Sequence, residues 1–91
     1  MVNRLLHVFF EIRRTMKITF YGTRGSCPTP GKSTLKYGGN TACVLVESNG
    51  GDKLILDAGT GIRVLGDEMV KNHDDVYLLV SHNHYDHIQG F

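Results

Sequence analysis

The stretch TACVLVESNGGDKLIL, residues 41–56, contains two apolar segments separated by a turn. Residues 41–47 and 53–56 are rich in Val, Leu and Ile, which favour buried strands. Between them lies Asn49-Gly50-Gly51-Asp52, and adjacent Asn and Gly residues are typical of tight hairpin turns. This stretch therefore predicts two buried antiparallel strands, and the rest of the fold is expected to assemble around them.

The segments on either side of the hairpin predict a sheet with one helix. Residues 17–21 alternate polar and apolar side chains, as a half-buried strand does. Residues 61–72 carry apolar side chains at helical spacing, and residues 76–80 form an apolar run that predicts a buried strand with residues 77–79 in the core. The order strand, hairpin, helix, strand predicts an α/β (α+β) fold: a mostly antiparallel or mixed sheet with a helix on one face.

One long loop interrupts this pattern. Residues 22–40 hold five of the eleven glycines and both prolines. Long loops inside compact domains are usually functional, so this segment is expected to border a site.

Length and composition exclude several classes of protein. Ninety-one residues allow one domain, and ten Lys and Arg against nine Asp and Glu give a net charge of +1, which predicts no strong nucleic-acid footprint. Cys27 and Cys43 form no C-x-x-C pattern, which favours two free thiols in a reducing cytosol. No run reaches the ~18 apolar residues of a membrane span. We therefore expect a cytoplasmic protein without a membrane segment.

Residues 1–15 differ from the remainder of the chain. They carry three Arg against one Glu and a short apolar stretch, without the small-residue cleavage site of a secretory leader. We expect an appended extension that is dispensable to the fold, with the domain itself spanning residues 16–91. The alternative is a helix docked on the sheet, because Leu5, Val8, Phe9 and Ile12 fall at helical spacing.

Three of the five histidines occur within six residues, in the pattern His82-x-His84-x-Asp86-His87. Imidazole nitrogen and carboxylate oxygen are ligands that zinc prefers. In extended chain, residues i and i+2 face the same way, so His82 and His84 can bind one ion together, while Asp86 and His87 could bind a second. The alternatives are a solvated histidine-rich loop or histidines that cap a following helix.

The segment Ser81-His82-Asn83-His84-Tyr85-Asp86-His87 resembles the signature of the metallo-β-lactamase-fold hydrolases. The resemblance covers residues 16–91, about the first third of a typical member, and implies the N-terminal part of a four-layer αβ/βα sandwich. It implies that His82 and His84 are ligands of a first metal and that Asp86 and His87 are ligands of a second. Diiron oxygen reductases of the family typically have Glu at the position of His84, which favours two Zn²⁺ in the complete enzyme, with Mn²⁺ or Fe²⁺ as alternatives.

Asp57 is a further candidate, because it ends a buried apolar strand, where an unpartnered carboxylate is costly. Leu54-Ile55-Leu56-Asp57-Ala58-Gly59 is similar to the family element in which an Asp supports a metal-bound histidine. A hydrogen bond from a histidine N–H would satisfy the carboxylate and make that histidine a better ligand. The alternative is that Asp57 caps the helix predicted near Gly61.

Residues 20–26 and 37–41 resemble the phosphodiesterase branch of this superfamily, and Arg24 could meet a phosphate there, although a loop arginine is more often solvated. The leading prediction is therefore a hydrolase in which a metal-bound hydroxide attacks a small-molecule or nucleotide phosphodiester. Asp86 is the candidate catalytic residue that orients the nucleophile. The substrate-binding residues remain unassigned.

Two other classes of function stay open at this point. One is a non-enzymatic remnant or split-gene fragment that needs a partner chain, and the other is a small metal-binding module. A two-metal site needs roughly six ligands and residues 82–87 supply four, so the chain is expected to be inactive alone. Half a sandwich also leaves an apolar face uncovered, which predicts self-association or pairing with a complementing C-terminal chain.

Overall fold

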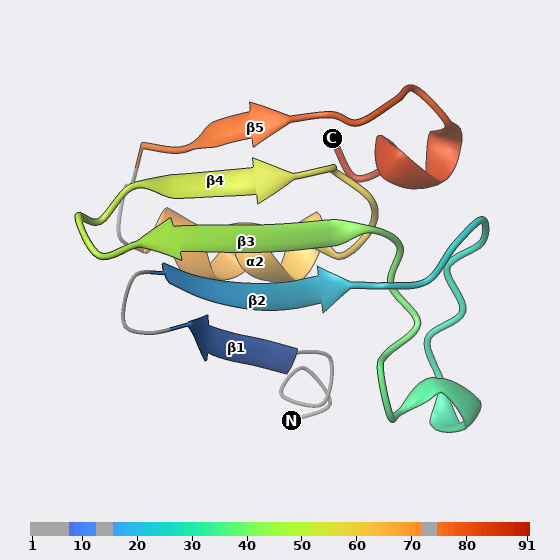
Figure 1. Ribbon diagram of the computed structural model, residues 1–91. Coiled ribbons are helices and arrows are strands. Elements are labelled where there is room, and N and C mark those ends of the chain that lie inside the picture. Colours follow the sequence, from blue (N-terminus) through green and yellow to red (C-terminus); the bar gives the residue numbers. More distant parts are fainter. Residues whose placement is uncertain (1–7, 13–15, 72–74) are drawn as a thin grey trace.

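The computed structural model describes residues 8–12, 16–71 and 75–91, and Figure 1 shows how they are arranged. In these ranges five strands form one mixed sheet in the order β1-β2-β3-β4-β5, with one α-helix on one face. The domain is therefore a small α+β unit. The strands are β1 (Val8–Ile12), β2 (Met16–Gly22), β3 (Cys43–Ser48), β4 (Lys53–Leu56) and β5 (Tyr77–Leu79); the helices are η1 (Lys32–Thr34), α2 (Ile62–Val70) and η2 (Tyr85–His87).

The predicted hairpin of β3 and β4 is confirmed. The two strands pair antiparallel, with Leu45 opposite Ile55. Their turn closes through hydrogen bonds from the Ser48 amide to the Asp52 carbonyl (3.0 Å) and from the Gly51 amide to the Ser48 carbonyl (3.1 Å). Gly51 has φ +92°, which a glycine adopts without strain. The sequence of the turn therefore sets the register of the hairpin.

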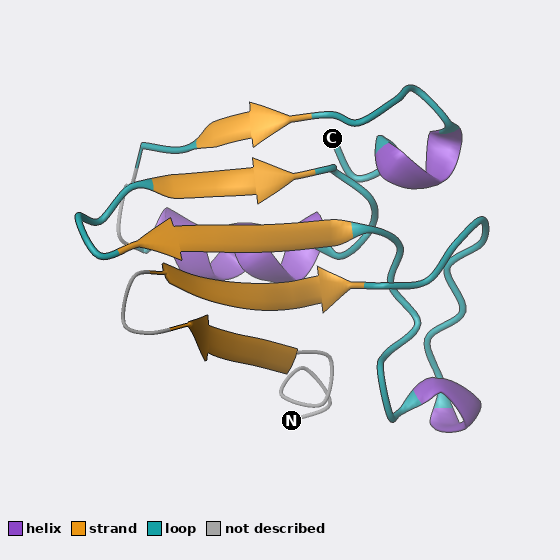
Figure 2. Ribbon diagram, viewed as in Figure 1, coloured by secondary structure: helices purple, strands orange, loops and turns teal. Residues whose placement is uncertain are grey.

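Helix α2 connects β4 to β5, which pair in parallel. Figure 2 shows the helix packed across one face of the strands. The helix was predicted over residues 61–72 and is confirmed over 62–70, because apolar side chains recur at helical spacing. The core between helix and sheet consists of Tyr21, Cys43, Leu45, Ile55, Val64 and Leu65, with Ile62, Met69 and Leu78 packed against it.

The opposite face of the sheet is apolar as well. Side chains that are paired across strands share a face, and the register defines two apolar rows on this second face. The rows are Ile18, Val46, Leu54 and Tyr77, and Phe20, Val44, Leu56 and Leu79. No layer of the described residues covers these rows, and their exposure increases toward β5.

The strand predicted over residues 76–80 is confirmed over 77–79, but the prediction that it is buried is wrong. Tyr77 is 70% exposed and Leu79 is 56% exposed, and only Leu78 packs against the core. The physical reason is position: β5 is an edge strand of the described sheet, and its second face has no covering layer. The apolar run is typical of a strand that is covered on both faces.

Residues 8–12 form strand β1, so the alternative of a helix is wrong for this segment. The strand pairs antiparallel with β2, with Val8 opposite Phe20 and Ile12 opposite Met16. A run rich in aromatic and β-branched residues favours a strand wherever a sheet edge is available to pair with it. The dispensability of residues 1–15 stays a prediction, which the melting temperature of a chain comprising residues 16–91 would test.

Within the described ranges, no helix has the length and apolar character needed to cross a membrane.

Candidate functional site

The candidate residues lie at the edge of the sheet where β4 and β5 both end. Because these strands run parallel, Asp57, which follows β4, stands beside the segment that follows β5 (Figure 1). The Asp57 amide donates to the Leu79 carbonyl at 2.8 Å, and the Ala58 amide donates to the His87 carbonyl at 2.8 Å. The parallel pairing thus brings the strand-ending aspartate and the histidine motif together.

Asp57 is the centre of the hydrogen-bond network at this edge. Its Oδ1 accepts from the Ser81 amide (2.6 Å), and its Oδ2 accepts from the Ser81 hydroxyl (2.9 Å) and contacts His87 Nδ1 (3.0 Å). The carboxylate is 14% exposed. Burial works to raise the pKa of Asp57, but the hydrogen bonds from Ser81 and His87 outweigh it and hold that pKa below its usual value. Asp57 is therefore ionised at neutral pH.

The backbone at Asp57 is left-handed, with φ +68°. Aspartate and asparagine tolerate this region better than other non-glycine residues. The conformation turns the chain sharply after β4 and directs the carboxylate toward Ser81. The alternative role of Asp57 as a helix cap is wrong, because Gly61 occupies the N-cap position of α2 and no side chain caps that helix.

This network also determines which ring nitrogens of two histidines carry a proton. The Ser81 hydroxyl has one proton, which it gives to the Asp57 carboxylate, so at its 2.9 Å contact with His82 Nδ1 the hydroxyl is the acceptor. His82 therefore carries its proton on Nδ1. An ionised carboxylate only accepts, so His87 likewise donates from Nδ1 to Asp57. Neutral rings at both positions present an unprotonated Nε2.

The three imidazoles of the motif lie together. The ring of His82 is 4.5 Å from that of His84 and 4.1 Å from that of His87, measured between centroids. His87 Nε2 lies 3.4 Å from Asp86 Oδ2. Helix η2 places Asp86 and His87 on one short turn, whereas His84 precedes it in extended conformation. The structure thus brings together all four predicted ligands and Asp57.

Asp86 has a partner that the sequence did not indicate. The Ser26 amide donates to Asp86 Oδ2 at 2.9 Å, across sixty residues of chain. This hydrogen bond holds the pKa of Asp86 below its usual value. A backbone amide in a distant loop leaves no mark in the sequence, because any residue type other than proline can supply it. Ser81 was also missed as a partner of Asp57, although its position directly before the motif was a usable signal.

A threonine pair, in which Thr41 is buried and Thr60 is half-buried, connects the site to the segment that follows the long loop. The Thr41 amide donates to Thr60 Oγ1 (2.9 Å), and the Thr60 amide donates to Thr41 Oγ1 (2.8 Å). Gly59 packs so closely that an added Cβ would lie 2.4 Å from Thr41 Oγ1 and 2.6 Å from the Asp86 carbonyl. Gln89 Nε2 donates to Thr41 Oγ1 at 3.3 Å. These contacts therefore fix three segments that are distant in sequence to one another: the one around Thr41, the one at residues 59–60 and the one at residues 86–89.

The donor set has the chemistry that a zinc ion requires, because hydrogen bonds hold a proton on Nδ1 of His82 and of His87, so that each ring in its neutral form offers Nε2 as a ligand atom. Among the residues that the structure describes, no group of three or more His, Cys, Asp or Glu side chains is arranged to hold a metal ion. The residues present thus fit a metal by type and by the Nδ1 hydrogen bonds of two of the histidines, and further ligands would have to complete the coordination. Comparisons with family models, with curated proteins and with solved structures find no match to this chain.

Proposed function

We propose that this chain is the N-terminal part of a metal-dependent hydrolase with a metallo-β-lactamase-type fold. The observation that carries the proposal is the hydrogen-bond network that holds a proton on Nδ1 of His82 and of His87, so that Nε2 of each neutral ring is the atom offered to a metal. A solvated histidine-rich loop has no need of such a network. The family named by the sequence resemblance uses this donor set for zinc.

In this proposal His82 and His84 hold a first zinc ion, and Asp86 and His87 hold a second. Zinc would supply a bound water of lowered pKa and an electrophile for the phosphoryl group of a small-molecule or nucleotide phosphodiester. The chain's own residues do the positioning. Asp57 fixes the ring of His87 and, through Ser81, the ring of His82. The Ser26 amide fixes the Asp86 carboxylate, which would orient the attacking water.

The chain supplies four of the roughly six protein ligands that a two-metal site needs. We propose that the remaining ligands come from a complementing C-terminal chain or segment, which would also form the second half of the four-layer sandwich. The two apolar rows on the second sheet face support this, because Tyr77 and Leu79 are exposed where that half would pack. In its absence the same face favours self-association.

The setting proposed for the protein is the cytoplasm. Cys27 and Cys43 are both free thiols, as a reducing compartment maintains them.

A titration of the chain with zinc, followed by calorimetry, tests the proposal. We expect binding that the double substitution His82→Ala/His84→Ala abolishes and that the matched substitution His73→Ala, outside the motif, leaves unchanged. Affinity should decrease below about pH 6, because imidazole must be neutral to bind a metal. Unchanged zinc stoichiometry in the double variant would refute the ligand assignment.

The second candidate is a non-enzymatic metal-binding module, which the incomplete set of four ligands favours. Turnover distinguishes the two. The enzyme is supported if the chain binds zinc and hydrolyses an activated aryl phosphodiester once a C-terminal half is added, but not before. Zinc binding without turnover in any combination supports the module.

A further inference from the structure

A second polar feature lies in the long loop, away from the histidines. Residues from 23–24 and 33–38 line a solvent-open cavity of about 260 Å³. Its lining combines two cations with four hydroxyl groups and contains no carboxylate; the polar lining residues are Thr23, Arg24, Ser33, Thr34, Lys36 and Tyr37. Since a water molecule takes roughly 30 Å³, the cavity has room for a phosphate group together with several water molecules.

Neither cation of the cavity has a counter-ion among the residues that the structure describes. In the part of the chain that the structure describes, neither Arg24 nor Lys36 forms an ion pair with a carboxylate. Arg24 Nε donates to the Cys27 carbonyl at 2.8 Å, which orients the guanidinium and leaves its terminal amino groups available. Lys36 Nζ lies 5.4 Å from the centroid of the Tyr37 ring. Within the described part of the chain, the cavity thus presents two positive charges that no carboxylate pairs with.

The walls of the cavity are fixed by the loop's own hydrogen bonds. The Thr29 amide donates to the Gly39 carbonyl (2.8 Å), the Thr34 hydroxyl donates to the Thr29 carbonyl (2.7 Å), and the Gly38 amide donates to the Thr34 carbonyl (2.7 Å). At Gly39 an added Cβ would lie 2.2 Å from the Thr29 carbonyl, so the two sides of the loop are in direct contact. Because the backbone of the loop is held in place, ligand binding costs ordering entropy mainly at exposed side chains such as Lys36.

We propose that this cavity binds a phosphate group of a small phosphorylated ligand. A phosphate has several strong acceptor oxygens, and the lining offers a guanidinium, an ammonium and the hydroxyl groups of Thr23, Ser33 and Tyr37 as donors to them, while the Thr34 hydroxyl keeps its proton on the Thr29 carbonyl. A planar carboxylate has two oxygens and would leave part of this donor set unused. The net charge of +1 argues against a nucleic-acid strand as the ligand. The inference goes beyond the proposed hydrolysis and does not depend on a metal.

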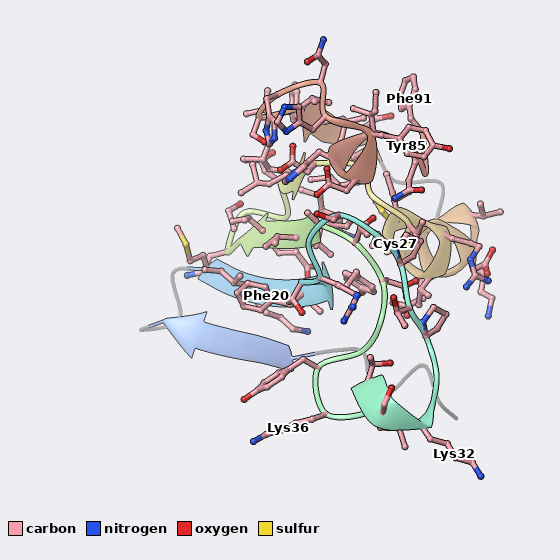
Figure 3. The ribbon with its side chains drawn as sticks, turned by 90° about the vertical axis from the view of Figure 1, so that its right-hand side faces the viewer. Phe20, Cys27, Lys32, Lys36, Tyr85 and Phe91 are labelled. Atoms are coloured by element: carbon pink, nitrogen blue, oxygen red, sulfur yellow. The ribbon has the colours of Figure 1, made fainter. Side chains whose placement is uncertain are left out.

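The cavity is connected to the histidine site by the same loop. Arg24 stands two residues before Ser26, whose amide holds Asp86. Figure 3 views the molecule from this end, with Lys32 and Lys36 at the foot of the loop and Tyr85 at the top. A phosphorylated ligand seated in the cavity would therefore occupy the same end of the sheet as the proposed reaction.

The test is an NMR titration of the metal-free chain with inorganic phosphate and, separately, with phenyl phosphate. We expect saturable shifts in the amides of residues 23–38. Lys36→Gln should weaken binding about tenfold, as expected for loss of one charge-assisted contact, and Arg24→Gln should weaken it at least as much. Lys32→Gln is the matched control: Lys32 is exposed, does not line the cavity and points away from Lys36 (Figure 3), so it should change the dissociation constant less than twofold.

Lys36→Gln is the decisive variant, because the Lys36 side chain forms no hydrogen bond with the described residues and its loss leaves the loop intact. Equal weakening by Lys32→Gln and Lys36→Gln would mean a general charge effect and would overturn the proposal, as would acetate binding as tightly as phosphate. Phenyl phosphate binding at least as tightly as inorganic phosphate identifies the ligand as an ester, and the reverse order identifies it as the free ion. A zinc titration of the same variants separates the two proposals, because the cavity variants should bind zinc normally.

Discussion

Replacing Asp57 with asparagine probes the hydrogen-bond network of the site with little change in shape. Asparagine tolerates the left-handed backbone at this position and keeps one carbonyl oxygen for the Ser81 amide. The amide NH₂ takes the place of Oδ2, so it donates where the carboxylate accepted. His87 Nδ1 must then become an acceptor. The Ser81 hydroxyl, now accepting from the amide, turns its proton toward His82 Nδ1. Both rings therefore move their own proton to Nε2.

The loss of stability in Asp57→Asn follows from the two hydrogen bonds that Oδ2 of Asp57 accepts, one from the Ser81 hydroxyl and one from His87. Each changes from a bond to a charged acceptor, which contributes about 1.5–3 kcal/mol, to a neutral bond of about 1 kcal/mol. We expect Asp57→Asn to lower the free energy of unfolding by about 2 kcal/mol. Zinc affinity should decrease about 10- to 100-fold, because Nε2 of both rings then carries a proton.

Urea denaturation measures the stability, and long-range ¹H–¹⁵N spectra of the imidazoles report which nitrogen is protonated. Asp67→Asn provides the matched control, because Asp67 is an exposed carboxylate on α2 outside this network. If Asp57→Asn shifts the urea midpoint no further than the control and leaves both rings protonated on Nδ1, the derivation of the tautomers is wrong.

Three further predictions concern other parts of the molecule. Gly39→Ala should cost about 1–3 kcal/mol in urea denaturation, because the new Cβ meets backbone atoms 2.2 Å away, whereas Gly25→Ala, with no atom within 4 Å, should be neutral. Burial raises the pKa of the Cys43 thiol from 9.0 to about 12, so the folded chain keeps a proton that the unfolded chain releases. Stability should therefore decrease by about 1.4 kcal/mol per pH unit above 9.0, and Cys43→Ala should remove that component of the slope between pH 8 and 11. The chain alone, with zinc or manganese, should hydrolyse an aryl phosphodiester no faster than its His84→Ala variant; turnover well above that variant would show that these residues complete a site by themselves.

The elements with local sequence signals were predictable. The glycine-rich turn of residues 49–52 determined the β3–β4 hairpin, and the apolar spacing from Ile62 to Val70 determined α2. The exposure of β5 could not be predicted from its composition. The run from Val76 to Val80 is typical of a strand with both faces covered, and composition does not indicate whether a covering layer is present. Strand β1 was missed because a short apolar segment fits helical spacing and strand alternation equally well.

The sequence identified the main side chains of the site, but not the backbone contacts that hold them. The spacing of His82, His84 and His87 selected the residues that the structure brings together, and a buried strand ending at Asp57 indicated that its carboxylate needs a partner. The contact between Ser26 and Asp86 could not be found in this way, because it depends on a backbone amide placed by the tertiary structure.

The parallel pairing of β4 and β5 also sets the order in which the chain can fold. The β3–β4 hairpin closes over a four-residue turn, whereas Asp57 meets Ser81 and His87 across 24 and 30 residues, and only after α2 has crossed the sheet. Contacts of large sequence separation carry the larger loop-closure cost, so the local hairpin forms early and the site closes late. Interactions that form after the folding transition state act mainly on the unfolding rate. We therefore expect the hydrogen bonds around Asp57 to lower the unfolding rate of the chain, by holding β5 in the sheet, and to have little effect on its folding rate.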